Sequence, residues 1–513
     1  MTYFEKDLIL NLKLAYEHLK QQDCVNAQGL FPWESGLQGK GRIISDSRQI
    51  KAGDIFIAYE GLRTDSHEYI PEVLNKKPGL IIAEKPSSLE EESQKAPILL
   101  VNNSRKAWSY LCALACGNPQ NELTNIAITG TNGKTSSLWM LKSLFESHNI
   151  PYATIGTLGI YLNGDQFRTS HTTPDPPILY LSLKLALEKG VKILAMEASS
   201  HAIAQEKLAP IRFNCIAWTS FSQDHLDFHK TMDAYWKVKW SLFLKSLAPG
   251  GRAIINTSIS PIPPYEKLAC QDIVTYGLGK STLKPLMAVS QIATGNGGSD
   301  VYLSYKGSEF HYQIPYWGSH NVENFLCALG VYEKAVGKMP SPRKTIDLSG
   351  VPGRLQKVPS KKLNAPCVLI DYAHTPDALE KTIETIKPYC SGMVYVVFGC
   401  GGERDRNKRK KMGLIAETLA DKVVLTSDNP RNEPAEKILK DIQRGFLKSQ
   451  PVMIEDRKSA IAWSIEYAKK DDFILVAGKG HENYQIIGSK VFEFDDFQVA
   501  KAILDSEEEE NIP

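Results

Sequence analysis

One glycine-containing segment carries the residue types that grip phosphate. Residues 125–137 read Asn-Ile-Ala-Ile-Thr-Gly-Thr-Asn-Gly-Lys-Thr-Ser-Ser. The apolar run at the start predicts a strand, and apolar residues at three-to-four spacing after it predict a helix. Loop N–H groups, the helix N-terminus and the Lys134 ammonium could bind a nucleotide triphosphate, and the Thr135 hydroxyl could hold Mg²⁺. The predicted phosphate-binding residues are Gly130, Thr131, Asn132, Gly133, Lys134, Thr135 and Ser136.

The spacing of this loop departs from the usual P-loop. That pattern places four residues between its first glycine and the Gly-Lys-[Ser/Thr] group. Only Thr131 and Asn132 separate Gly130 from Gly133, and Ile128 stands where the first glycine should lie. A short turn with a coincidental Gly-Lys-Thr is the alternative. The flanking strand and helix favour the phosphate loop.

Acidic residues and histidines follow two further apolar runs. Glu197 directly follows one run, at the strand end where parallel sheets bind ligands. Residues 223–229, Gln-Asp-His-Leu-Asp-Phe-His, follow the next. A lone histidine here would be read as a satisfied surface residue, but both groups beside a phosphate loop favour a Mg²⁺ site. Lys237 and Lys239 would repel that ion, so either they lie on a solvated helix face or one lysine is modified into an anion.

Four polar loops follow four predicted strands in the last third of the chain. Each alone is an ordinary turn, but in an open α/β sheet they would line one ligand-binding edge. Their arginines could pair with carboxylates in a bidentate manner, which predicts a carboxylate-bearing substrate. Asp428 and Glu482 could hold an ammonium group. The loops are residues 371–376, 399–409, 426–431 and 477–482.

The elements that must position these residues form an α/β pattern. Short β-branched runs alternate with helical stretches in three groups, and 513 residues at about 150 per domain also suggest three domains. We predict an N-terminal α/β domain over 1–120, a central ATPase domain with a mostly parallel sheet over 121–349, and a Rossmann-like domain over 350–513. Helices are predicted at 4–20, about 104–117, and 321–336. The predicted strands lie within 42–48, 53–59, 79–83, 97–101, 126–128, 192–196, 215–218, 251–256, 368–372, 393–398, 422–426 and 472–477.

Composition excludes several classes of protein. With 42% hydrophobic and 23% charged residues, the chain has the composition of a soluble globular protein. Its net charge of +2 gives no overall field that favours nucleic acid or an anionic membrane. Nine cysteines without framework spacing fit a reducing compartment. Neither a signal-peptide pattern nor a run of about 18 apolar residues occurs, so we expect a cytoplasmic protein without a membrane span.

Taken in order, these motifs resemble those of the Mur ligase family over nearly the whole chain. The short phosphate loop is the form this family uses. The resemblance implies an N-terminal domain for a UDP moiety, a central ATPase and a C-terminal domain for an incoming amino acid. The matching motifs are Asp46–Arg48, Gly130–Thr135, Thr172–Pro174, Glu197–His201, Asp224–Asp227, Tyr235–Lys239, Asn321–Asn324, Gly353–Arg354, Asp371–His374, Asp428–Arg431 and Gly478–Glu482.

The resemblance also implies a reaction in peptidoglycan precursor synthesis. ATP would phosphorylate the D-glutamyl carboxylate of UDP-N-acetylmuramoyl-L-alanyl-D-glutamate, and the amino group of meso-diaminopimelate would attack the acyl phosphate. Phosphorylation supplies the leaving group that a free carboxylate lacks, and Mg²⁺ at two sites would stabilise the developing charge. We expect no nucleic-acid partner, and we expect the protein to be a monomer.

Roles follow by residue from the same resemblance. Lys134, His225, Lys239 and Asp371 would be catalytic. Thr135, Glu197, His225 and Lys239 would serve the metal ions, with Lys239 rather than Lys237 carrying a CO₂-derived carbamate. Asn324 and Arg354 would contact the adenine and the ribose–phosphate part of ATP. The nucleotide-substrate contacts would be Ser45, Ser47, Thr172, Thr173, Ser199, Gln205 and Lys207, and the amino-acid contacts Arg404, Asp428, Asn429, Pro430, Arg431, Gly478 and Glu482.

Arg431 would select the amino acid. Relatives that add L-lysine lack Asp-Asn-Pro-Arg at this loop, and diaminopimelate has a distal carboxylate that lysine lacks. Lys207 stands where the family usually has arginine, and His171 where asparagine is frequent. A sister ligase, either L-lysine-adding or like folylpolyglutamate synthase, would share the ATPase domain without this C-terminal motif pair. A nucleotide-dependent switch would release phosphate without either acceptor.

Overall fold

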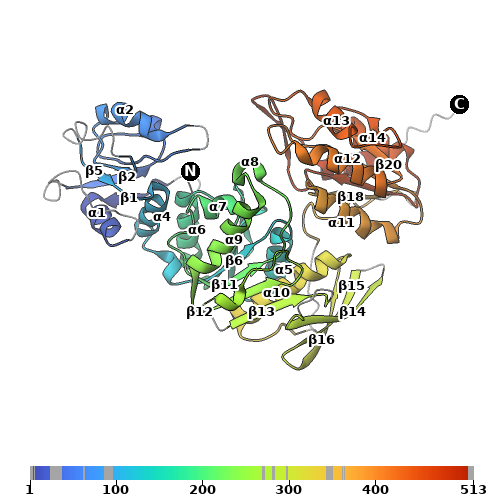
Figure 1. Cartoon of the computed structure of the whole chain (residues 1–513), viewed down its shortest axis with the longest axis horizontal. Helices are drawn as coiled ribbons and strands as arrows, with labels where there is room; N and C mark the ends of the chain where they lie inside the picture. Colours follow the sequence, from blue (N-terminus) through green and yellow to red (C-terminus); the bar gives the residue numbers. More distant parts are fainter. Residues whose placement is uncertain are drawn as a thin grey trace.

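Three α/β units follow one another along the chain (Figure 1). The structure is a computed structural model, and it describes residues 4, 6–22, 37–61, 64–85, 96–169, 171–268, 272–279, 284–295, 298–341, 350–360, 362 and 364–506. The blue N-terminal unit and the orange C-terminal unit lie on either side of the central unit in Figure 1. The predicted α/β class with mostly parallel sheets is confirmed.

The N-terminal unit is a five-stranded sheet in the order β1-β2-β3-β4-β5. Strands β2 to β5 run parallel, and β1 pairs with β2 in the antiparallel sense. The prediction of one helix over 4–20 is wrong in its first half. Residues 9–11 form the short strand β1, in which Leu10 is buried, and the helix begins only after the Asn11 side chain, which caps it. The elements are β1 (Ile9–Asn11), α1 (Leu12–Lys20), β2 (Lys40–Ile44), β3 (Ile55–Ile57), α2 (Ile70–Asn75), β4 (Leu80–Ala83), β5 (Ile98–Leu100) and α4 (Ser104–Ala115).

The central unit has an eleven-stranded sheet in the order β16-β15-β14-β13-β12-β11-β6-β10-β7-β8-β9. Its middle strands, from β14 to β7 in this order, are parallel, and antiparallel strands extend both edges. Its strands are β6 (Thr124–Thr129), β7 (Tyr152–Gly156), β8 (Gly159–Leu162), β9 (Asp165–Phe167), β10 (Ile193–Glu197), β11 (Phe213–Trp218), β12 (Leu247–Asn256), β13 (Asp272–Gly277), β14 (Met287–Gly295), β15 (Gly298–Tyr305) and β16 (Ser308–Ile314). Its helices are α5 (Lys134–Ser147), α6 (Pro176–Glu188), α7 (Ser200–Ala204), α8 (Leu226–His229), α9 (Met232–Ser246) and α10 (Ser319–Val336).

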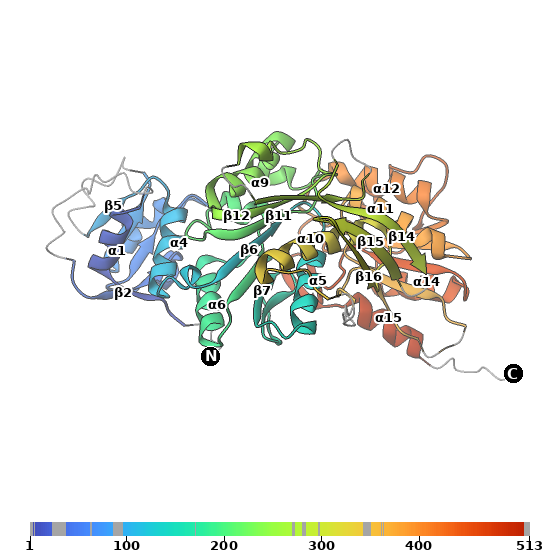
Figure 2. The same cartoon turned by 90° about the horizontal axis from the view of Figure 1, so that it is seen from below.

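Helices cover both faces of this sheet (Figure 2). Alternate residues of β6 point to opposite faces, as the pleat of a strand requires. Ala127 belongs to the core that contains α6 and α9, whereas Ile126 and Ile128 belong to the core that contains α5 and α10. Both faces of β6 are therefore apolar, which is the reason for its uninterrupted apolar run.

The C-terminal unit has a six-stranded sheet in the order β17-β18-β22-β19-β20-β21, in which β18 to β21 are parallel. Helices α11 to α13 pack on one face, and α14 and α15 on the other. Its strands are β17 (Gln356–Lys357), β18 (Cys367–Asp371), β19 (Val394–Phe398), β20 (Lys422–Leu425), β21 (Val452–Met453), β22 (Phe473–Ala477), β23 (Tyr484–Ile487) and β24 (Lys490–Glu493). Its helices are α11 (Pro376–Ile386), α12 (Asn407–Leu419), α13 (Ala435–Gln443), α14 (Arg457–Tyr467) and α15 (Asp496–Asp505).

The sequence predicts both the absence of a membrane span and the positions of two domain boundaries. Among the described residues, no helix has the length and apolar content needed to cross a bilayer. The domain boundaries after residues 120 and 349 stay predictions, and the second falls at the end of 342–349, outside the described part of the chain.

Candidate active site

A cleft of about 720 Å³ is lined by residues of the central and C-terminal units. Nearly all of the predicted site residues line it, including the phosphate loop from Gly130 to Ser136, Glu197, Lys239 and Arg431. Three predicted residues are not among its lining: Ser45 and Ser47, which lie in the N-terminal unit, and Pro430. The cleft thus joins motifs that are more than 300 positions apart in the sequence.

The phosphate loop is held by the end of the neighbouring strand β11. The Thr219 and Ser220 hydroxyls donate to the Asn132 carbonyl at 2.6 and 2.9 Å. Gly133 adopts a φ of 88° directly before α5, and a Cβ at this position would collide with the Asn324 side chain. Glycine is therefore required both by the left-handed backbone and by the close approach of α10.

Two lysines share one carbonyl of this loop. The Nζ atoms of Lys134 and Lys239 each donate to the Gly130 carbonyl at 2.8 Å. Burial lowers the pKa of both ammonium groups, and for Lys239 the charge of Lys134 lowers the pKa further. The neutral amine is thereby favoured at Lys239, whose side chain is 1% exposed.

Glu197 lies at the end of β10, level with Ile128 of β6 and beside the loop. Its carboxylate accepts the Thr135 hydroxyl at 3.0 and 3.1 Å. It also accepts the backbone N–H and the hydroxyl of Thr157, at 2.8 and 3.1 Å. Sequence reasoning missed Thr157, although its place directly after the apolar strand 152–156 was an available signal.

His225 occupies a strained position at the start of α8. Its φ is 55°, and its Nε2 lies 3.3 Å from an oxygen of Asp224. Burial lowers the pKa of His225, so the imidazole is held neutral, the form that ligates metals. The ring of His201 packs edge-on against it at 4.8 Å.

Thr173 and Ser199, two of the residues predicted to contact the nucleotide substrate, lie beside Glu197. The Thr173 hydroxyl lies 2.9 Å from the Glu197 carbonyl and 3.2 Å from the Ser199 hydroxyl. Lys207 is buried and pairs with Asp175 at 2.7 Å. Lysine at position 207, where arginine is usual in the resembled family, therefore still lines the cleft as a cation.

Of the two predicted ATP contacts, Asn324 lies on α10 beside Gly133, whereas Arg354 lies where the chain enters the C-terminal unit. The Arg354 guanidinium stacks over the Tyr372 ring at 4.5 Å. Both oxygens of Asp371 accept backbone N–H groups, from Leu355 at 2.7 Å and from Ala373 at 2.8 Å. Burial raises the pKa of Asp371. Asp371 thus ties the segment of Arg354 to the loop after β18.

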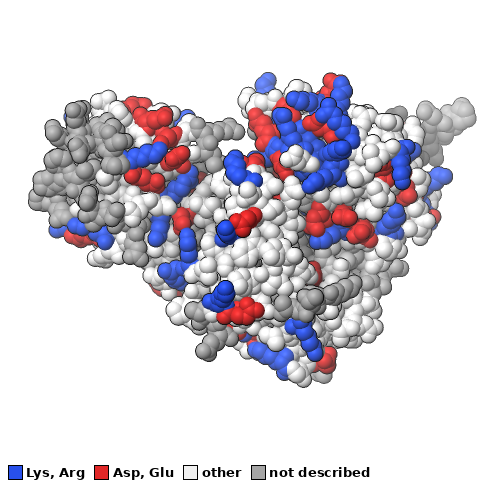
Figure 3. Space-filling model, in the orientation of Figure 1, with Lys and Arg blue, Asp and Glu red and all other residues white. Residues whose placement is uncertain are grey.

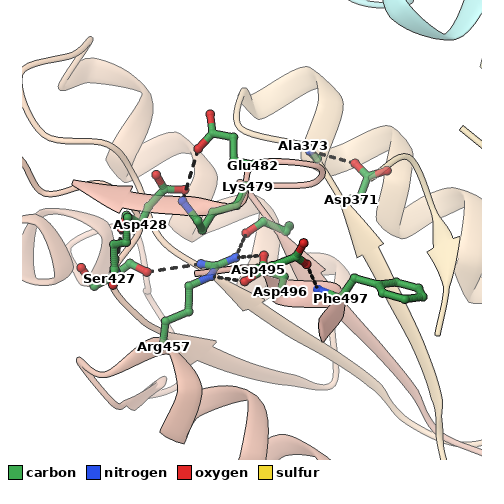
Figure 4. A network of polar contacts seen from close by, with 12 residues as sticks. Asp371, Ala373, Ser427, Asp428, Arg457, Lys479, Glu482, Asp495, Asp496 and Phe497 are labelled. Atoms are coloured by element: carbon green, nitrogen blue, oxygen red, sulfur yellow. Dashed lines mark hydrogen bonds and ion pairs between the residues drawn. The ribbon is translucent and has the colours of Figure 1, made fainter. Parts of the chain in front are cut away.

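The four polar loops of the C-terminal unit meet at one edge of its sheet, as predicted. Each follows a parallel strand and contributes at least one residue to the cleft. Arg431 is held at a φ of 54°, and its guanidinium donates to the Gly402 carbonyl at 2.8 Å. Asp428 and Glu482 lie close together in this pocket, and Figure 4 shows both above buried cations. Burial raises the pKa of Glu482, and the charge of Asp428 raises it further.

Comparison with known proteins assigns the family. Residues 128–332 match the profile of the Mur ligase middle domain, and residues 353–480 match that of the Mur ligase glutamate ligase domain. The UDP-N-acetylmuramoyl-L-alanyl-D-glutamate–2,6-diaminopimelate ligase of Coxiella burnetii is 36% identical over 470 residues, which cover 90% of this chain and 94% of that relative. The chain belongs to the Mur ligase family. The Aquifex aeolicus ligase with the same name is also 36% identical, over 90% of this Mur ligase and 93% of that relative.

Solved structures agree with this assignment. A structure of a UDP-N-acetylmuramoyl-L-alanyl-D-glutamate–2,6-diaminopimelate ligase superposes with a TM-score of 0.62 at 30% identity, covering 90% of this Mur ligase and 94% of that chain. A MurF ligase from Thermotoga maritima, solved with ADP, gives a TM-score of 0.59 at 19% identity, covering 85% and 93%, and so shares the fold.

The central and C-terminal units of this Mur ligase touch directly at the phosphate loop. The Asn132 amide donates to the Asp377 carboxylate, at the start of α11, at 3.0 Å. Lys411 of α12 donates to Gln223 at 2.9 Å. No sequence signal pointed to these contacts, because they depend on how two separately folded sheets are oriented.

Basic side chains gather beside α12 and α13 on the face shown in Figure 3. Arg404, Arg406, Lys410 and Lys411 are exposed in this part of the C-terminal unit, and Arg404 also lines the cleft. Arg404 thus places part of this basic patch at the cleft, although the chain as a whole has a net charge of only +2.

Proposed function

We propose that this chain is an ATP-dependent ligase that joins meso-diaminopimelate to the D-glutamyl carboxylate of UDP-N-acetylmuramoyl-L-alanyl-D-glutamate. One observation carries the proposal: a pocket with Arg431, Asp428 and Glu482 opens onto the same cleft as the phosphate loop. Relatives that share about a third of the sequence over nearly its whole length bear the name of this ligase.

The reaction needs a carboxylate that has been activated by phosphorylation and an amine placed to attack it. In our proposal Lys134 and the loop N–H groups bind the triphosphate of ATP, with Asn324 and Arg354 at its nucleoside end. The γ-phosphoryl group passes to the D-glutamyl carboxylate, and the amine displaces phosphate from the acyl phosphate. Lys134 now donates to two loop carbonyls, so it is already placed among the groups that would surround the phosphates.

The donor set fits Mg²⁺ bound together with phosphate. Among the described residues, no cluster of three or more His, Cys, Asp or Glu side chains could enclose a metal ion. Mg²⁺ commonly uses one or two carboxylates plus substrate phosphates and water, and Glu197 with Thr135 supplies such a partial set. His225 would complete a second site. When bound, Mg²⁺ would neutralise charge on the transferring phosphoryl group.

We propose that Lys239 carries a carbamate. The reaction of an amine with CO₂ requires the neutral form, which burial favours at Lys239. The carbamate would place an anion on a side chain whose Nζ lies 2.8 Å from the loop carbonyl of Gly130. Lys134 would then lie beside an anion at position 239 rather than beside a second amine.

The C-terminal pocket suits an amino acid with charges at both ends. Arg431 can pair with the distal carboxylate of diaminopimelate, which L-lysine lacks. Asp428 and Glu482 can bind an ammonium group. The UDP moiety would lie toward the N-terminal unit, near Ser45 and Ser47.

The decisive experiment is ATP-dependent phosphate release. With UDP-N-acetylmuramoyl-L-alanyl-D-glutamate present, meso-diaminopimelate should support turnover, and L-lysine or no amino acid should not. Comparable rates with L-lysine would make the chain a different ligase of the family. Release without the nucleotide acceptor would indicate a nucleotide switch.

A further inference from the structure

The geometry points to Lys479 as a positioning residue that keeps the Glu482 carboxylate oriented and negatively charged beneath the incoming amino acid. This inference rests on the proposed function, because it takes the pocket of Asp428, Arg431 and Glu482 as the amino-acid site. Lys479 itself is not among the residues that line the cleft, so it acts through its neighbours.

Lys479 is fully enclosed below the pocket, with 0% exposure. Its Nζ donates to Glu482 at 3.2 Å and to the side-chain oxygen of Asn429 at 3.3 Å. The ammonium also lies 5.4 Å from the centre of the Tyr484 ring. A buried ammonium group costs free energy unless it is paired, so these contacts hold the Lys479 ammonium in a fixed position.

The hydrogen bonds among the described residues reach one oxygen of Glu482. Oε2 accepts Lys479 and also the Asn429 amide, the latter at 2.9 Å. Among the described residues the other oxygen has no hydrogen-bond partner, and Figure 4 shows it turned away from Lys479. Because Glu482 lines the cleft, this free oxygen is available to a ligand ammonium.

Asn429 links the two acids into one unit. Its backbone N–H donates to Asp428 at 2.6 Å, and its side-chain oxygen also accepts the backbone N–H of Ile486 at 2.9 Å. Lys479 therefore contacts both a pocket acid and the side chain that orders the loop of the other acid. Removing the Lys479 ammonium group would leave Asn429 and Glu482 without the hydrogen-bond donor that they share.

The charge balance of the pocket gives Lys479 a second effect. Burial and the charge of Asp428 raise the pKa of Glu482, whereas Lys479 lowers it. Without Lys479, Glu482 would take up a proton at higher pH and lose the charge that attracts an ammonium group. The charged or titratable groups that face Glu482 are Lys479, Asp428, Arg431, Arg457, Tyr372 and Tyr484.

The test is Lys479→Met in the full chain, with KM and kcat/KM measured between pH 5.5 and 9 for each substrate. We expect the KM for meso-diaminopimelate to rise about tenfold, the loss typical of a charge-assisted contact. The acid limb of kcat/KM for meso-diaminopimelate should move up by about one pH unit, because an opposite charge within hydrogen-bond distance lowers a carboxyl pKa by about that amount or more. The KM values for ATP and the nucleotide substrate should stay within about twofold, since their contacts are untouched.

Two matched variants separate charge from packing. Lys479→Arg keeps the positive charge, so its acid limb should stay at the parent pH even if the KM changes. Lys501→Met removes a lysine that pairs with Asp505 on α15, outside the pocket, and all three KM values should remain at the parent level.

The outcomes decide between the two proposals. A parent-like acid limb in Lys479→Met, or an equal rise of all three KM values, overturns the role of Lys479. If Lys479→Met does not fold, Glu482→Gln must abolish the acid limb, and a surviving limb overturns the assignment. An Arg431→Ala variant with unchanged KM for meso-diaminopimelate refutes the amino-acid pocket itself, whatever Lys479 does.

Discussion

The two ends of the cleft treat charge in opposite ways. At the phosphate loop, Lys134 and Lys239 converge on one carbonyl, and the nearby carboxylate of Glu197 is satisfied by hydroxyl and amide donors rather than by a lysine. In the C-terminal pocket, Asp428 and Glu482 converge above buried cations. Like charges are thus crowded at both ends, but with opposite sign.

This difference teaches how each end is prepared for its ligand. Crowding and burial lower the pKa of the two lysines and raise that of Glu482, so the charged forms are disfavoured at both ends. A ligand group of opposite charge relieves that penalty: a polyphosphate at the loop, and an ammonium group beside Asp428 and Glu482. Changes at the two ends should therefore affect different substrates.

The largest effect is expected from removing the lysine at the phosphate end. Lys239→Ala should lower the rate of phosphate release about 10²- to 10³-fold, because a charge that stabilises the phosphoryl transfer is lost. Short-chain carboxylates should restore part of the rate if the lysine acts as a carbamate. The matched control is Lys237→Ala, since Lys237 is an exposed partner of Asp233. Full activity of Lys239→Ala without added carboxylate would contradict the prediction.

The second largest effect is expected from removing the buried cation Arg457 beneath the C-terminal pocket. Arg457 is fully buried and pairs with Asp496 at 2.7 Å. Arg457→Met should lower the free energy of unfolding of the C-terminal unit by about 3–5 kcal/mol, because Asp496 remains as an unpaired buried charge. Urea unfolding followed by circular dichroism measures this change. The exposed Arg444→Met is the control, and an equal effect in both variants would refute the role of burial.

The ligand end of the same pocket should show selectivity. Arg431→Ala should raise the KM for meso-diaminopimelate about 10- to 100-fold, the range for a lost charge-assisted hydrogen bond, while the KM for ATP changes little. Steady-state kinetics with each substrate varied in turn tests this. The exposed Arg406→Ala provides a control for charge alone. Equal rises in the KM for ATP and for meso-diaminopimelate would argue against independent binding at the two ends of the cleft.

The smallest effect is expected from adding a single methyl group at Gly478. Gly478 has a φ of 114°, and a Cβ there would lie 2.7 Å from Asp428 Oδ2. Gly478→Ala should raise the KM for meso-diaminopimelate by about 3- to 10-fold, because strain of about 1 kcal/mol displaces the carboxylate. Gly190→Ala is the control, since Gly190 also has positive φ but open space around its Cβ position. A parent-like KM in Gly478→Ala would show that Asp428 tolerates the displacement.

Much of this arrangement could be predicted from sequence because its signals are local. Apolar runs followed by polar loops located the strands of the central and C-terminal sheets that carry the predicted site residues, and parallel strands bring their carboxyl ends together. Strands β7 and β21 have no counterpart among the predicted strands. The helix predicted over 4–20 failed at Leu10, where a short antiparallel pairing with Gly41 overrides helical periodicity. Such a pairing depends on a partner about 30 residues away.

Other parts of the site depend on contacts between residues that are distant in the sequence. Thr157 supports Glu197 only because β7 and β10 are neighbours in the sheet. The contact from Asn132 to Asp377 depends on the orientation of two units. Lys479 lies inside a recognisable motif, but only its complete burial shows that it serves Glu482 from below.

The ion pair of Arg457 and Asp496 links the amino-acid pocket to α15, the last helix in the described part of the chain. Arg457 donates to the carbonyls of Ser427 and Ala477, the residues directly before Asp428 and Gly478. A polypeptide released at Asp495 would contain every residue of the cleft and still leave this guanidinium buried without its carboxylate. We therefore expect the pocket to form completely only after α15 has been synthesised, so a chain that ends before α15 should bind the amino acid poorly.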